Sequence, residues 1–213
     1  MAMRVVEIFH TIQGEGVDTG VRTVFVRTAG CDLDCVWCDT DYAKDANAGA
    51  DMTVERAMAM VGAFGTKHVC ITGGEPFLQP DLGAFVEVLV GKGNVVSITT
   101  NGTHDVSRLP RLDKVAIHMD VKCPSSGMDG RTQKGNLAFL KATDQLKFVI
   151  MDRRDYEYAR NFIGSERPKC NIVFQPVWGS DARVLTEWVL EDRLDVRVML
   201  QTHKHIWGGE KGR

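Results

Sequence analysis

The stretch that decides the fold is Val24-Phe-Val-Arg-Thr-Ala-Gly-Cys31-Asp-Leu-Asp-Cys35-Val-Trp-Cys38. A short β-branched run is followed at once by three cysteines in eight residues, spaced CxxxCxxC. Such a loop wraps three soft thiolates around one centre, which favours an iron–sulfur cluster or zinc. Three local ligands on a four-iron cube leave one iron without a protein thiolate, so that iron is open to a substrate or cofactor.

Structural zinc is the competing interpretation, and it requires a fourth ligand. The candidate donors elsewhere in the chain are His10, His68, Cys70, Cys123, Cys170 and His203. Cys70 and Cys170 fall in apolar strand patterns, where a cysteine acts as a small buried hydrophobe. Ligand chemistry alone leaves zinc open, whereas the 3+2 spacing after an early strand favours the cluster.

Outward from this loop, short apolar runs alternate with segments of helical period, which predicts a mostly parallel α/β sheet. Segments 101–114 and 124–143 carry turn residues instead of helical patterns, and 213 residues is short for a complete eight-unit barrel. We therefore expect a single domain, 1–213, with the architecture of a partial barrel with reduced helices. The predicted strands are 24–28, 68–72, 95–100, 115–121, 145–150, 171–177 and 196–201. The predicted helices are 54–64 with Thr53 as N-cap, 81–90, 154–163 and 181–194.

Composition excludes several classes of protein. The 26 Lys and Arg against 28 Asp and Glu give a net charge of −2, so bulk charge attracts neither nucleic acid nor membrane. Apolar residues at 44% and charged residues at 25% argue against disorder. The amino terminus resembles no targeting signal, and no run of about 18 apolar residues predicts a membrane span. A reducing, cytoplasmic location is the resulting expectation, where clustered cysteines bind metal or catalyse.

The cysteine loop, with Trp37 before its last cysteine, and Gly73-Gly-Glu-Pro76 after the strand 68–72 together resemble the radical S-adenosylmethionine (SAM) superfamily. The resemblance implies a 4Fe–4S cluster held by Cys31, Cys35 and Cys38, with SAM on the fourth iron. Electron transfer then cleaves SAM to a 5′-deoxyadenosyl radical. The residues that the resemblance assigns to SAM are Trp37, Asp39, Gly73, Gly74, Glu75, Lys122, Ser125 and Gln175.

Three further segments, 9–16, 38–40 and 200–204, resemble the 7-carboxy-7-deazaguanine synthase family of the queuosine pathway. That resemblance covers nearly the whole chain. It implies conversion of 6-carboxy-5,6,7,8-tetrahydropterin to 7-carboxy-7-deazaguanine with loss of ammonia. It also implies Mg²⁺ and a partial (β/α)6-type barrel with fewer helices than the parent fold.

The same resemblance assigns the remaining site residues. Thr40 is the expected Mg²⁺ ligand, since a hydroxyl with substrate oxygens and water suits that hard ion. Arg27 is expected to clamp the substrate carboxylate, and His203 is expected on a terminal strand. Glu75 has a structural alternative, and segment 200–213 is a candidate for closing the site. The full expected substrate set is Ile12, Gln13, Gly14, Glu15, Arg27, Thr72 and His203.

Two other functions remain open at this level. One is an activase that installs a glycyl radical on a partner protein, against which segments 12–16 and 200–204 argue. The other is a zinc-dependent structural or nucleic-acid-binding module, which the near-neutral charge disfavours. The expected partners are a small pterin, a reductant such as flavodoxin and, by resemblance, a second copy in a homodimer.

Overall fold

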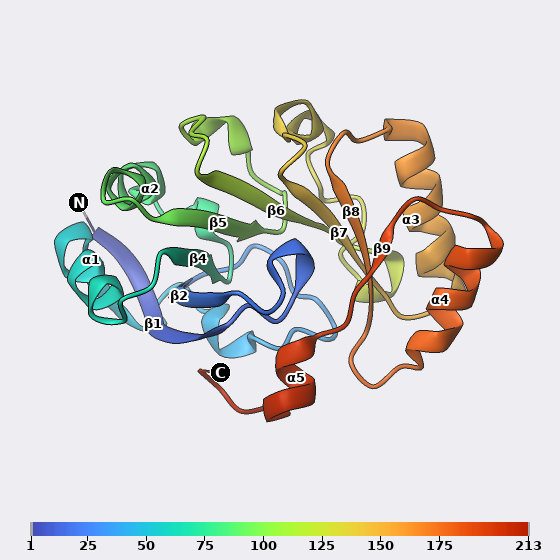
Figure 1. The fold of residues 1–213 in the computed structure, drawn as a ribbon, viewed down its shortest axis with the longest axis horizontal. Helices are drawn as coiled ribbons and strands as arrows, with labels where there is room; N and C mark the ends of the chain where they lie inside the picture. The colour runs from blue at the N-terminus through green and yellow to red at the C-terminus, as the bar shows by residue number, and fades with distance from the viewer. Residues whose placement is uncertain (1, 213) are drawn as a thin grey trace.

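The computed structural model describes residues 2–212, which form one nine-stranded sheet with helices on its outer face (Figure 1). The strand order is β3-β1-β2-β4-β5-β6-β7-β8-β9, and the sheet does not close on itself. All pairs from β2·β4 to β8·β9 are parallel, whereas β1 pairs antiparallel with β2 and β3. The partial barrel that the sequence predicts is thereby confirmed.

The strands and helices have the following bounds. The strands are β1 (Ala2–Ile12), β2 (Arg22–Thr28), β3 (Ala50–Thr53), β4 (His68–Gly73), β5 (Val95–Thr100), β6 (Val115–Val121), β7 (Gln145–Ile150), β8 (Asn171–Pro176) and β9 (Arg197–Val198). The α-helices are α1 (Val54–Ala63), α2 (Leu82–Gly91), α3 (Arg153–Glu166), α4 (Ala182–Glu191) and α5 (Thr202–Trp207). The 3₁₀ turns are η1 (Gly16–Asp18), η2 (Asp41–Ala43), η3 (Pro76–Leu78), η4 (Val106–Arg108), η5 (Pro124–Ser126) and η6 (Lys134–Phe139).

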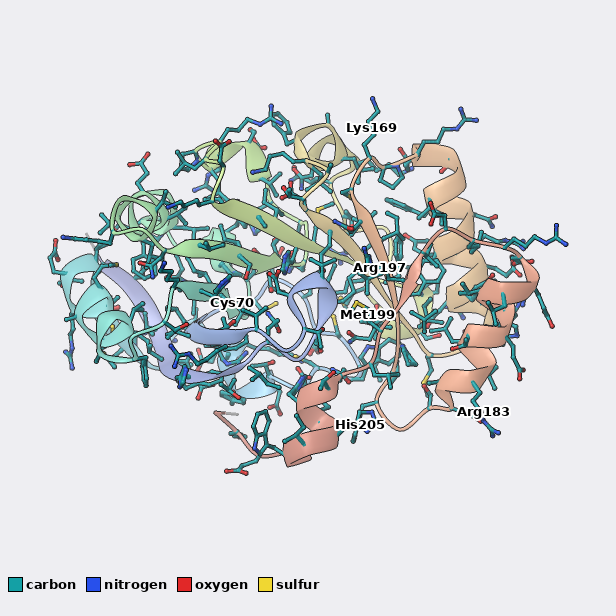
Figure 2. All side chains as sticks on the ribbon, viewed as in Figure 1. Cys70, Lys169, Arg183, Arg197, Met199 and His205 are labelled. Atoms are coloured by element: carbon teal, nitrogen blue, oxygen red, sulfur yellow. The ribbon has the colours of Figure 1, made fainter. Side chains whose placement is uncertain are left out.

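The central strands have one apolar face and one polar face. In β6 the residues Val115, Ile117, Met119 and Val121 join the hydrophobic core under the helices. The alternate residues His118 and Asp120 face the other way and line an internal cavity. Because side chains alternate along a strand, this period of two divides the sheet into a packed outside and a polar inside. In Figure 2 Cys70 lies within the sheet, whereas Arg183 of α4 projects into solvent.

Local signals set the helix starts. The Thr53 hydroxyl accepts a hydrogen bond from the Arg56 amide at 3.2 Å, as predicted for the N-cap of α1. Asp152 caps α3 in the same way through the Asp155 amide at 3.0 Å. Phe148 packs edge-on against Phe162 of α3, with ring centroids 5.6 Å apart, which fixes that helix on the sheet.

The crossovers around β6 are reduced, as the turn-rich segments predict. Only η4 connects β5 to β6, and only η5 and η6 connect β6 to β7. In Figure 1 the four longer helices flank the two ends of the sheet, whereas α5 lies below its open side. The open side of the sheet is therefore left to loops and to the C-terminal segment.

Three elements differ from the expectations. β1 was not predicted, because its polar residues, including Glu7, His10 and Thr11, interrupt any apolar alternation. β3 has four residues, too few to show a period. The terminal strand expected over 196–201 was wrong in extent: β9 covers Arg197–Val198 and the chain then turns into α5. His203 lies on that helix and not on a strand.

The three cysteines outside the motif occupy packing positions. Cys70 and Cys123 are each 1% exposed, and Cys170 is partly buried against the core. Burial raises the pKa of the Cys170 thiol to about 11. Within residues 2–212, no helix has the length and apolarity needed to cross a bilayer.

Candidate active site

A cavity of about 590 Å³ opens among the carboxyl ends of the parallel strands. That edge is where loops of a parallel α/β sheet converge, and the volume is typical of ligand sites. The cavity is lined by all the predicted site residues except Glu75 and Ser125: Ile12, Gln13, Gly14, Glu15, Arg27, Cys31, Cys35, Trp37, Cys38, Asp39, Thr40, Thr72, Gly73, Gly74, Lys122, Gln175 and His203.

The cysteine loop is held by backbone hydrogen bonds to its surroundings. The Cys31 amide donates to the Lys44 carbonyl at 3.1 Å, and the Val36 amide donates to the Ser126 carbonyl at 3.1 Å. All three thiols are free and partly exposed, and all three face the same cavity. The loop therefore presents a three-thiolate set with one side open to a ligand, which fits a four-iron cluster.

The three cysteine sulfurs do not have the close spacing that a zinc site requires. Tetrahedral zinc with thiolate bonds near 2.3 Å brings two sulfurs to about 3.8 Å. Within residues 2–212, the one set of three His, Cys, Asp or Glu ligand atoms lying within 4.8 Å of one another is Glu15, Asp39 and His203, so the three sulfurs form no such set. Of the fourth donors that the sequence offered, His203 alone lines the cavity.

The glycine pair after β4 allows a close backbone approach. Gly73 has φ +140, and a Cβ there would lie 2.2 Å from the Thr28 carbonyl oxygen. A Cβ on Gly74 would lie 1.9 Å from the Gly30 oxygen. Both positions therefore require glycine, and their main chain lines the cavity beside the cysteine loop. That surface suits the small polar end of SAM.

Glu75 and Ser125 do not line the cavity. The Glu75 carboxylate is fully buried and accepts hydrogen bonds from the Phe77 amide at 3.0 Å, the Thr100 hydroxyl at 2.8 Å and the Asn101 amide at 2.7 Å. Burial raises its pKa to about 7, against these hydrogen bonds. The Ser125 amide donates to Asp155 at 2.8 Å. The Glu75 side chain and the Ser125 main chain thus make contacts within the protein, which is consistent with the structural alternative for Glu75.

An ion-pair network fills the inner wall. Lys147 of β7 lies 2.5 Å from Glu15 and 3.3 Å from Asp120 of β6. Burial alone would lower the pKa of Lys147, but the two carboxylates outweigh it and raise that pKa. Burial alone would also lower the pKa of Lys122, but Asp120, at 3.2 Å, raises it. The cavity wall therefore holds a buried cation at Lys147 and a partly buried one at Lys122, each paired with a carboxylate of the wall.

Glu15 is the hub of this network. Its carboxylate accepts from Lys147, from the Gln201 amide at 2.6 Å and from the Gln175 amide at 3.3 Å. Burial would raise its pKa, yet the Lys147 charge and these hydrogen bonds lower it strongly. The Gln175 Oε1 atom is buried without a hydrogen-bond partner in residues 2–212, whereas His118 Nε2, also without a hydrogen bond there, lies 3.5 Å from Asp18 Oδ2. Such orphaned atoms on a cavity wall fit a bound polar ligand.

Contacts with Glu7, Phe9 and Tyr42 fix the orientation of the Arg27 side chain. Its Nε donates to Glu7 Oε1 at 2.7 Å, and the Tyr42 hydroxyl donates to the same oxygen at 2.7 Å. The guanidinium lies 5.6 Å from the Phe9 ring centroid and 5.8 Å from that of Tyr42. Because Nε is engaged, the two terminal nitrogens are the donors that a ligand carboxylate would meet. Arg27 and Glu7 thus form a partly buried ion pair on the cavity side, held in place by the Tyr42 hydroxyl.

Oxygen ligands gather around Thr40. Its hydroxyl donates to Asp39 Oδ1 at 2.9 Å, and Asp39 Oδ2 lies 2.8 Å from Lys204 of α5. Asp39 also belongs to the close set with Glu15 and His203. Hydroxyl and carboxylate oxygens are the donors that Mg²⁺ prefers, and imidazole is not. The Thr40 and Asp39 oxygens therefore fit a hard divalent ion.

Five polar residues line the cavity although the sequence did not predict them as site residues: His118, Asp120, Lys147, Gln145 and Gln201. The available signal was a charged or imidazole side chain at alternate positions inside strongly apolar strands, where burial is costly without a purpose. Gln201 gave no such signal. It reaches Glu15 only because the chain turns at Thr202, whose amide donates to the Gly14 carbonyl at 2.9 Å.

Residues 25–142 match the model of the radical SAM superfamily. That match covers more than half of the chain and contains both the three-thiolate loop and the glycine pair. With the open parallel sheet, it places the chain in the radical SAM superfamily, whose cofactors are a 4Fe–4S cluster and SAM.

Comparison with similar proteins identifies the family within this superfamily. The chain is 41% identical to the 7-carboxy-7-deazaguanine synthase of Koribacter versatilis, over 98% of each chain. It is 39% identical to the Thermoplasma acidophilum enzyme of that name, over 99% of this chain and 100% of the other. The crystal structure of QueE from Escherichia coli superposes with a TM-score of 0.79 at 25% identity, over 95% of both chains. The chain belongs to the 7-carboxy-7-deazaguanine synthase family.

Proposed function

We propose that this chain converts 6-carboxy-5,6,7,8-tetrahydropterin into 7-carboxy-7-deazaguanine with release of ammonia. The observation that carries the proposal is one cavity that joins the three thiols, the glycine pair and the 12–15 segment. An activase of a glycyl-radical protein would need an open mouth for a protein segment. Here residues 208–212 line the cavity, and Lys211 lies 4.3 Å from the Tyr42 ring centroid, which favours a small substrate.

The cofactors supply the radical chemistry, and the chain holds and orients them. Cys31, Cys35 and Cys38 would hold the 4Fe–4S cluster. The main chain at Gly73 and Gly74 would hold the methionine end of SAM, with Trp37, Asp39, Lys122 and Gln175 along its length. Lys122 is charged and fixed by Asp120, so it meets an anionic group without moving.

The substrate would lie against the Glu15 hub. Gln13, Gly14 and Glu15 offer amide, backbone and carboxylate groups that match the donor and acceptor edge of a pterin. Glu15 stays ionised near neutral pH because Lys147 lowers its pKa. Arg27, braced by Glu7, would bind the substrate carboxylate, with Thr72 and His203 completing the walls. These groups hold the ring at one orientation, which is how positioning accelerates a reaction.

Thr40 would ligate Mg²⁺ together with substrate oxygens, and Asp39 would support it. Of the segment 200–213, residues 200–212 would exclude water, because α5 is tied to the site through Lys204 and Asp39; residue 213 lies outside the described residues. Outside the chain, the reaction needs an electron donor such as flavodoxin. We also propose one domain over 1–213, a homodimer, and a cytoplasmic location that keeps the three thiols reduced.

The test is an anaerobic assay of reconstituted protein with carboxytetrahydropterin, SAM, Mg²⁺ and dithionite. Formation of the deazaguanine, followed by mass, supports the proposal. Cys35→Ala is the matched negative control, since it removes one thiolate. A wild type with a full cluster that cleaves SAM yet leaves the pterin unchanged refutes this substrate.

A further inference from the structure

Asn101 follows β5 directly and is 7% exposed, yet it lines the cavity beside the cysteine loop. Its side-chain nitrogen Nδ2 lies 3.9 Å from Cys31 Sγ and 2.9 Å from Asp32 Oδ1. An amide nitrogen carries two hydrogens, so it serves both acceptors at once. Cys31 is one of the three thiols assigned to the cluster, and no sequence motif marked Asn101 as its neighbour.

The orientation of this amide is fixed by its other contacts. Asn101 Oδ1 accepts from the Thr103 amide at 2.9 Å and from the Thr103 hydroxyl at 2.7 Å. With the oxygen end occupied by two donors, the nitrogen end must face Asp32 and Cys31. The Asn101 backbone amide donates to the buried Glu75 carboxylate at 2.7 Å. Glu75, the third residue of the Gly73–Pro76 motif, thereby holds the strand end that carries Asn101.

We propose that Asn101 donates an N–H···S hydrogen bond to the Cys31 thiolate when that thiolate binds the cluster, and thereby raises the cluster's reduction potential. The inference rests on the proposed cluster and deepens it. The physical reason is charge. Reduction adds an electron that spreads over the iron-bound sulfurs, and a donor to such a sulfur stabilises the reduced state. Asn101 is a positioning residue, since it acts through Cys31.

Asp32 is the second acceptor of the Asn101 amide, and its carboxylate lies next to the cluster loop. Its carboxylate accepts a hydrogen bond from the Asn101 amide at 2.9 Å, so this amide contacts Asp32 and Cys31 at the same time. A carboxylate so close to the loop opposes reduction of the cluster, and Asn101 screens it from Cys31. Loss of the amide would therefore remove the donor to Cys31 and one of the hydrogen bonds to Asp32, which would retain His104 at 3.5 Å. Both changes move the potential in the same, negative direction.

The experiment is an EPR-monitored redox titration of the anaerobically reconstituted protein without SAM. Asn101→Leu keeps the volume and removes the donor. We expect about a threefold smaller reduced-to-oxidised ratio at a fixed potential, or about 28 mV at 59 mV per tenfold. The matched control is Asn94→Leu, the same change just before the other end of β5, where the amide donates to the Thr66 and Lys67 carbonyls. It should leave the potential unchanged.

A second readout is the exchangeable-deuteron coupling to the reduced cluster after transfer to D₂O, which Asn101→Leu should weaken. An unchanged potential at equal iron content overturns the proposal, as does an equal shift in both leucine variants. If Asn101→Leu fails to load four irons, Thr103→Val decides, because it loosens the same amide. A negative shift supports the proposal and no shift overturns it. Product formation by the wild type is scored separately, so the assigned reaction can fail while this inference stands, or the reverse.

Discussion

Glu15 Oε2 lies 2.5 Å from Lys147 Nζ, and this contact joins the loop after the first strand to β7, across the open side of the sheet. Figure 1 shows that loop crossing from β1 toward β7 and β8. The same carboxylate reaches Gln175 of β8 and Gln201 before α5. One side chain thus ties the N-terminal strands, the last strands and the C-terminal segment together around the cavity.

Lys147→Met should destabilise the chain without cofactors by about 3 kcal/mol, because it removes the cation shared by the buried Asp120 carboxylate and the partly buried Glu15 carboxylate. Urea unfolding measures this change. The control is Lys134→Met, which removes an exposed partner of Glu166 and should cost about 1 kcal/mol or less. Equal losses of unfolding free energy in the two variants would show that the Glu15–Lys147 pair stabilises the fold no more than an exposed ion pair does.

The pair should also set a pH window for stability. The folded state lowers the pKa of Glu15, so its contribution is present above the unfolded value of about 4.3 and is lost as pH falls below it. The folded state raises the pKa of Lys147, so that contribution is lost as pH rises past about 10.4. Unfolding free energies from pH 3 to 11 should differ least between wild type and Glu15→Gln/Lys147→Met at the two extremes. A constant difference across this range would contradict the assignment.

Arg27→Ala should lower kcat/KM for the carboxypterin by about tenfold to a hundredfold, since it removes charge-assisted donors to the substrate carboxylate. SAM binding, measured by calorimetry, should be nearly unchanged. Glu7→Gln keeps an acceptor for Arg27 Nε and should cost less. If Arg27→Ala weakens SAM and pterin equally, its role is to support the wall.

Thr40→Val should raise the Mg²⁺ concentration for half-maximal activity by about tenfold or more, because a methyl group replaces the oxygen ligand. Titration of activity with Mg²⁺ in chelator-treated buffer measures the shift. Thr99→Val, at another threonine on the cavity wall, is the control and should keep the wild-type titration. Identical curves for Thr40→Val and wild type would exclude the ligand role.

Gly14→Ala should raise KM for the pterin by about tenfold. The new Cβ would lie 2.1 Å from His203 Nδ1 and 2.6 Å from His203 Cβ, so α5 must shift away from the site. Gly164→Ala is the control, because a Cβ there meets nothing within 4 Å and the position lies in α3. Circular dichroism should show both variants folded. A wild-type KM in Gly14→Ala would mean that His203 does not border the substrate.

The sequence predicted the parallel core well because its strands carry signals that do not depend on their partners. The run Val115-Ala-Ile-His-Met119 is apolar almost throughout, and Thr53 marks a helix start locally. β1 could not be predicted, because its polar residues bond to distant segments of the chain, as Glu7 does to Arg27. Sequence spacing carries no trace of that kind of contact.

The candidate site divides in the same way. Cys31, Cys35 and Cys38 could be placed from spacing, because one loop must hold all three. Lys147 and Asn101 could not, since their roles appear only when β7 meets Glu15 and the end of β5 meets Cys31. His203 was expected at the site but on the wrong element, because the turn at Thr202 depends on the tertiary bond to Gly14.

The most direct test of the central claim is the combined iron and product measurement on anaerobically reconstituted wild type. We predict close to four irons per chain and a brown protein. With SAM, Mg²⁺ and a reductant, that protein should convert carboxytetrahydropterin to a product with the mass of 7-carboxy-7-deazaguanine. Stoichiometric zinc with no iron–sulfide absorbance and no deazaguanine would contradict it.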